Sequence, residues 1–126
     1  MRIGWRKKKT SPLLPFMQQI EQNLARLHSI LEADIAAGSA AEPKKEWLES
    51  LVRCEVNIVT FKDRISRLMP ARNACQARVI EKKILEKAEE ILQIFCSNRS
   101  FFSFISSQLE PATKELCALG EDYAFV

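Results

Sequence analysis

The chain has few of the residues from which enzyme and metal sites are usually built. Its 126 residues include one histidine, three glycines and one tyrosine. Scattered glycines give no glycine-rich phosphate loop, and a single histidine offers no Ser-His-Asp arrangement beyond itself. No Glu-x-x-His pair is present, which excludes the usual di-iron site of a helical bundle. We therefore predict a protein that is not an enzyme, with no catalytic, cofactor-binding or metal-ligating residues.

The chain also lacks long apolar runs and closely paired cysteines. No stretch approaches the roughly eighteen unbroken apolar residues of a membrane-spanning helix. The basic start is followed by Thr10, Ser11 and Pro12 rather than by the apolar core of a signal peptide. Four cysteines lie 21 residues apart without a Cys-x-x-Cys pair, which favours buried thiols over a zinc site: Cys54, Cys75, Cys96 and Cys117. We expect a cytoplasmic protein with reduced cysteines.

What the chain does have is apolar residues at alternating steps of three and four, which line one face of an α-helix. Such rows predict helices over residues 15–37 and 43–68, from after residue 74 to about 95, and from 101 to about 119. Two rows show the pattern most clearly: Met17, Ile20, Leu24, Leu27 and Leu31 in the first helix, and Leu51, Cys54, Ile58, Phe61, Ile65 and Leu68 in the second.

The four helices predict an all-α protein. We expect an antiparallel four-helix bundle over residues 13–120, because short loops favour antiparallel neighbours. Residues 1–12 are predicted to form a flexible basic arm, and residues 121–126 a C-terminal tail. The fourth helix is expected to kink near Pro111, since proline removes a backbone donor.

Single residues mark where the helices should end. Gly38 and Gly120 are expected to end the first and fourth helices, because glycine readily adopts the left-handed conformation of a helix stop. Pro70 interrupts the pattern after the second helix, where the chain either reverses or continues as a kinked rod. The charged residues of the third helix, Glu81 among them, are expected to face solvent.

The second helix carries more apolar residues than one face can hold. Beside its main row runs another, made of Leu48, Val52, Val56 and Val59. A helix that is apolar over so much of its circumference needs neighbours on more than one side. It is therefore either central in the bundle or part of an intermolecular contact, and we predict a homodimer.

Aromatic residues point to a partner-binding surface as well. Phe101, Phe102 and Phe104 cannot all lie on one face of the fourth helix, and Trp47 stands in the first turn of the second helix. Rings left in water forgo burial energy, and aromatic residues are enriched at interfaces. A wide internal core that takes all four rings is the alternative.

The N-terminus differs in charge from the rest of the chain. Five of the 19 basic residues and no acidic residue lie in the first ten positions, which leaves 14 basic and 16 acidic residues elsewhere. The arm, with Trp5 between its charges, can serve solubility or act as an electrostatic tether to a membrane or to nucleic acid: Arg2, Trp5, Arg6, Lys7, Lys8 and Lys9.

His28 raises one further possibility, because histidine phosphotransfer domains are also helical bundles of this size. No Lys-Gly pair follows His28, however, and a histidine at the edge of the core explains the position better. By elimination, the chain is predicted to bind another protein through apolar helix surfaces, as a small adaptor, a secretion-type chaperone, or an inhibitor or regulator of a larger enzyme. The tether and phosphotransfer at His28 are the two alternatives.

Overall fold

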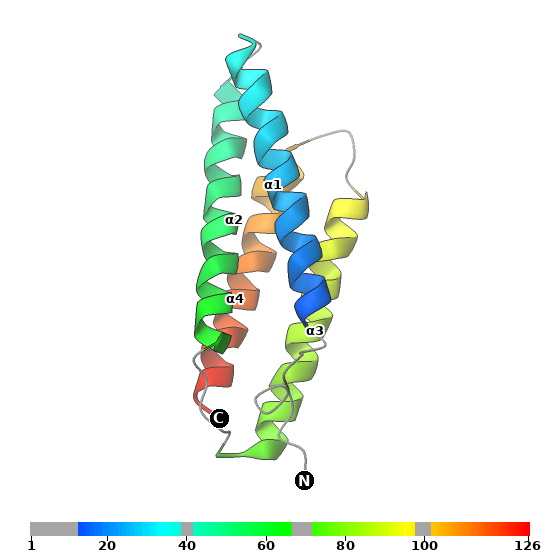
Figure 1. The fold of residues 1–126 in the computed structure, drawn as a ribbon, viewed down its shortest axis with the longest axis vertical. Helices are drawn as coiled ribbons and strands as arrows, with labels where there is room; N and C mark the ends of the chain where they lie inside the picture. Colours follow the sequence, from blue (N-terminus) through cyan, green and yellow to red (C-terminus); the bar gives the residue numbers. More distant parts are fainter. Residues whose placement is uncertain (1–12, 39–41, 67–71, 98–101) are drawn as a thin grey trace.

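A computed structural model describes residues 13–38, 42–66, 72–97 and 102–126, and these segments form a helical bundle (Figure 1). Its elements are α1 (Leu14–Ala36), α2 (Glu42–Ser66), α3 (Ala74–Ser97), the π-helical turn η2 (Ile105–Leu109) and α4 (Glu110–Ala124). Within those ranges no residue lies in a strand, so the prediction of an all-α, four-helix protein is confirmed. None of the described helices is long and apolar enough to cross a bilayer. The predicted arm, residues 1–12, and Phe101 lie outside the described residues.

Gly38 ends α1 as the sequence predicts. Its φ of +80° is a conformation that residues with a Cβ rarely adopt, and its N–H donates to the Ile35 carbonyl at 3.1 Å. At the other end of α1, Pro15 lies in the first turn, where its missing N–H removes no helical hydrogen bond.

Cross-helix contacts show which way each helix runs. Lys62 pairs with Glu21, and His28 with Glu55, so α1 and α2 are antiparallel. The same reasoning makes α2 and α4 parallel, because Ser50 contacts Glu110 near the start of both helices while Arg64 contacts Cys117 further along both. In Figure 1, α1 and α3 run upward while α2 and α4 run downward.

The helices are arranged so that α2 and α3 lie diagonally across the bundle. α2 packs against α1 and α4, and α3 packs against the same two helices, whereas α2 and α3 make no contact within the described residues. Because α2 runs downward and α3 upward in Figure 1, the chain reverses between them rather than continuing as one kinked rod. Successive helices alternate in direction, yet the neighbours α2 and α4 are parallel, which loop length alone does not predict.

The core is built from the apolar rows that the sequence shows. Each helix contributes its inward row, and the largest fully buried side chains come from all four: Leu13, Met17, Ile20, Leu24, Leu31, Leu51, Ile58, Phe61, Ile84, Ile91, Ile105 and Tyr123. Because every helix presents one apolar stripe to this core, the opposite face of each helix is exposed to solvent.

The π-helical turn lies directly before Pro111, where the sequence predicts a kink. Proline has no N–H to donate to the carbonyl one turn earlier, so a regular α-helix cannot continue through it unchanged. The turn before Pro111 is π-helical instead, and the Glu110 N–H donates to the carbonyl of Ile105, five residues back rather than four. The helix thus passes from η2 into α4 without a loop.

One prediction at the C-terminal end is wrong, because Gly120 does not end α4, which continues to Ala124. The first four residues of the predicted tail, 121–124, are therefore part of this helix. Tyr123 is fully buried and its hydroxyl donates a hydrogen bond to Glu81. Glu81 was expected to face solvent, but it is 8% exposed because it accepts this bond from α4. The buried tyrosine ring and the hydrogen bonds from the Arg72 and Asn73 N–H groups to the Val126 carbonyl oxygen both hold the C-terminal end against the bundle.

Candidate protein-binding surface

Three valines of α2 form an exposed apolar row on the side of the helix opposite the core. Val52, Val56 and Val59 are 42, 56 and 63% exposed. Their spacing of four and three residues aligns them along one face. Leu48, which the sequence adds to the same row, is half-buried and packs against the core. We call Val52, Val56 and Val59 the valine row.

Charged residues extend the valine row in both directions at the same spacing. Going outward, Glu49 and Lys45 precede Val52, and Asp63 follows Val59; all three are exposed. The resulting alternation of four and three residues is the heptad spacing of a helix-pairing seam. We call this set the outer seam: Lys45, Glu49, Val52, Val56, Val59 and Asp63.

Contacts on the α1 side help to fix the direction in which the valine row faces. Lys62 donates to Glu21 of α1 at 3.0 and 3.1 Å, and Glu55 accepts from His28 at 2.7 Å. Both contacts come from the side of α2 between the core and the outer seam. They hold that side of the helix against α1.

On its other side, α2 is held against α4 by a longer series of polar contacts. Glu110 accepts hydrogen bonds from the Ser50 hydroxyl at 2.6 Å and from Arg53 at 2.9 Å. These donors, the Ser50 hydroxyl first, lower the pKa of the Glu110 carboxyl. One turn further along, Asn57 donates to the Thr113 hydroxyl at 3.2 Å. With α1 on one side and α4 on the other, α2 cannot rotate to bury the valine row.

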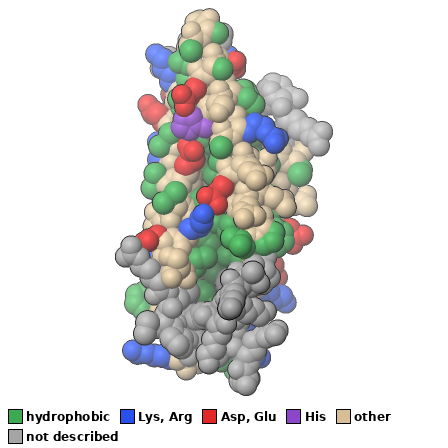
Figure 2. Space-filling view, in the orientation of Figure 1, with side chains coloured by type: hydrophobic (Ala, Val, Ile, Leu, Met, Phe, Trp, Pro, Cys, Tyr) green, Lys and Arg blue, Asp and Glu red, His purple; other side chains and the backbone are tan. Residues whose placement is uncertain are grey.

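The single histidine lies between two carboxylates at the α1–α2 contact. Nδ1 of His28 is 2.7 Å from Glu55, and Nε2 contacts Glu32 one turn along α1. Figure 2 shows the histidine with acidic side chains next to it. The hydrogen bond to Glu55 raises the pKa of His28, and the negative charges of both carboxylates add to this effect. An incoming phosphoryl group would meet both charges, so this geometry gives no support to phosphotransfer.

The predicted aromatic residues pack mainly against the chain itself. Trp47 and Phe102 are half-buried, with ring centroids 6.2 Å apart, and so bring the start of α2 to the segment before η2. Phe104 is 4% exposed and meets Phe95 edge-on at 6.5 Å. The wide internal core thus accounts for Phe104. A role for Trp47 and Phe102 in partner binding stays a prediction.

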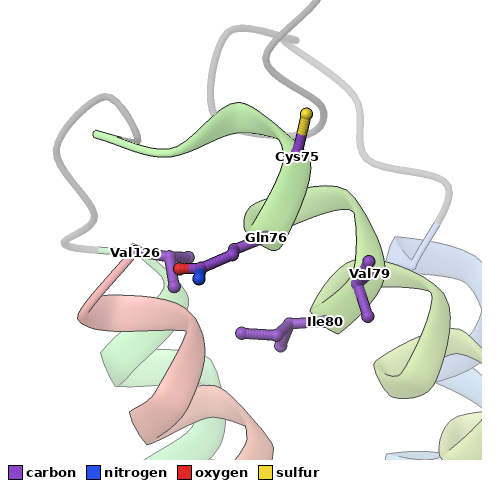
Figure 3. Close-up of a pocket in the computed structure, with 5 residues that line it drawn as sticks. All are labelled: Cys75, Gln76, Val79, Ile80 and Val126. Atoms are coloured by element: carbon purple, nitrogen blue, oxygen red, sulfur yellow. The ribbon is translucent and has the colours of Figure 1, made fainter.

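A surface hollow of about 270 Å³ lies where α3 begins and α4 ends, and the residues in it are mostly apolar (Figure 3). Cys75 lies at its rim, with the thiol pointing away from Ile80 and Val126.

Of the four free cysteines only Cys54 is buried, and this burial raises the pKa of its thiol to about 11. In the described part of the chain, no three His, Cys, Asp or Glu side chains gather as metal ligands would.

Sequence reasoning identified the valines but not the polar contacts between α2 and α4 that keep the valines exposed. Ser50, Asn57 and Thr113 follow no motif, and their positions between two apolar rows become meaningful only once α2 and α4 are parallel neighbours. No protein-family model, curated protein or solved structure matches the chain. Its function therefore has to be argued from its own residues.

Proposed function

We propose that the chain is a non-enzymatic protein-binding module and that the valine row of α2 is its docking surface for a partner helix. The observation that supports this is an apolar row exposed on a face that α1 and α4 prevent from turning inward. Single exposed apolar residues are common on proteins, whereas apolar residues gathered on one face are typical of an interaction surface.

The size of the surface sets the strength of binding to expect. Full burial of a valine side chain contributes about 1.5–3 kcal/mol, so covering three half-exposed valines contributes roughly 2–5 kcal/mol from this chain. Association itself costs about 4 kcal/mol or more. The partner must therefore supply a matching apolar face, and the complex should be reversible rather than permanent.

The four free thiols fit a reducing compartment, which supports the cytoplasm as the location of the protein.

The experiment compares Val56→Lys with Val79→Lys. Val79, on α3, is 55% exposed and Val56 is 56% exposed, so the two variants add the same charge at equally exposed positions. Each full-length chain is used as bait in its source lysate, at low and at high salt, and binding of every captured protein is then measured with purified components.

The proposal expects a complex that survives high salt, is lost with Val56→Lys and is unchanged with Val79→Lys, because apolar contacts are not screened by ions. Binding that is unchanged by Val56→Lys would overturn the proposal. Binding that disappears at high salt and on deletion of residues 1–10 would instead favour the alternative, an electrostatic tether through the basic arm.

A further inference from the structure

The outer seam of α2 is complementary to itself when two copies of the helix run in opposite directions. Resting on the proposed function, we infer that the partner at the valine row is α2 of a second copy of this chain, paired antiparallel about a two-fold axis. The argument comes from the order of charged and apolar residues along the seam, all of which are exposed.

Antiparallel helices with heptad spacing meet in successive layers, and each layer contains one residue from each helix. In one register, Val52 faces Val56 of the second copy. That register also places Lys45 opposite Asp63 of the second copy. The two-fold axis repeats both contacts, so the dimer has an apolar centre of two valine layers with an opposite-charge pair at each end.

Other pairings of the same seam are less favourable. In a parallel pair each residue meets its own copy, so Lys45, Glu49 and Asp63 would each face a like charge. Shifting the antiparallel pair by one heptad in either direction also places a carboxylate against a valine, since Val52 then faces Asp63 or Glu49, and in addition it loses both Lys45–Asp63 pairs. Charge order therefore selects a single direction and a single register.

The selected register also explains why the contact should be weak. Glu49 faces Val59 of the second copy, and this imperfect layer also occurs twice. The valine row is short compared with the area that permanent dimers bury. We expect a dimer that dissociates on dilution, so the surface would be free at low concentration.

The first test measures self-association of the full-length chain by sedimentation equilibrium from micromolar to millimolar concentration. Val56→Lys should weaken the dimer at least tenfold, because a lysine enters both central layers, while Val79→Lys should leave it unchanged. A dimer that forms equally well with Val56→Lys would overturn the inference.

The second test addresses the register by exchanging the charges. Lys45→Asp alone and Asp63→Lys alone should each weaken the dimer about tenfold at low salt, because each places like charges in both end layers. The double variant should restore the dimer. An equimolar mixture of the two single variants should form a heterodimer, since both end layers are then of opposite charge. Losses that add in the double variant would overturn the register.

The two proposals can fail separately. A chain that remains monomeric at millimolar concentration, while Val56→Lys abolishes its binding to a different protein, would overturn the self-pairing and leave the docking surface standing. A Val56→Lys variant that changes neither self-association nor any other binding would overturn both.

Discussion

Gly120 is the residue whose replacement tests the packing of α4 on α2 most directly. An alanine Cβ at this position would lie 2.6 Å from Cδ1 and 3.0 Å from Cε1 of Phe61, whose side chain is fully buried. Carbon atoms without a bond between them prefer a separation of about 3.5–4.0 Å. The ring would have to move by most of an ångström in a close-packed core, or α4 would have to move away from α2.

Two opposing effects decide the result of Gly120→Ala. In an ordinary helix interior alanine is about 1 kcal/mol more favourable than glycine. Overpacking of a core costs about 1–3 kcal/mol. We therefore expect Gly120→Ala to lower the free energy of unfolding by about 1 kcal/mol, as measured by urea denaturation followed by circular dichroism.

Matched variants separate the two effects. Ala118→Gly, at an exposed position of the same helix, measures the helix-propensity effect alone and should cost about 1 kcal/mol. Phe61→Leu makes room for the new methyl group, so Gly120→Ala should be less harmful in that background, with a coupling energy of about 0.5–3 kcal/mol. If Gly120→Ala stabilises the wild-type chain by about 1 kcal/mol, the close contact between α2 and α4 is wrong.

Three more predictions follow from buried or charged groups. Tyr123→Phe removes the hydroxyl that donates to buried Glu81 and should lower stability by about 1–3 kcal/mol in thermal or urea unfolding, whereas no loss would mean that the carboxyl finds another donor. Protonated His28 stabilises the fold below its ordinary pKa of 6.5, and this contribution is lost as the pH rises through the raised folded value, so the stability difference between wild type and His28→Gln should shrink as the pH rises from 6.5 through that value. A difference that stays constant with pH would contradict the carboxylate contacts. Alkylation of the native chain followed by mass spectrometry should modify exposed Cys75 quickly and Cys54 only on unfolding; equal rates would mean that the core opens readily.

Helix content and inward faces could be predicted from the sequence because they depend on local spacing. The row from Leu51 to Phe61 is buried as expected, and Gly38 ends α1. Both features need only a period of 3.6 residues and the backbone freedom of glycine. Neither depends on which helix lies next to which.

What the sequence could not supply is the choice of neighbours. Spacing assigns a face to each residue but does not say which helix covers it, so the parallel contact of α2 with α4 was missed. Glu81 illustrates the consequence, since a charged residue beside an apolar row is expected in solvent unless a donor such as Tyr123 is known to meet it. Gly120 is similar, because a glycine near the end of a helix normally marks the stop, and only the Phe61 ring shows that it is needed for close approach.

The valine row is not required by a four-helix fold, as the equivalent faces of the other helices show. Along the outer face of α1 the exposed residues are Gln18, Gln22, Ala25, Ser29 and Glu32, and along that of α3 they include Lys82, Glu86 and Glu89. Each of these faces carries one exposed large apolar residue in the same row, Leu14 on α1 and Val79 on α3, rather than three in succession. Valine is also a poorer helix former than lysine or glutamate by a few tenths of a kcal/mol per residue. The valine row therefore weakens the isolated chain slightly, which is the opposite of what a purely structural role predicts and is consistent with a surface that is covered when the protein acts.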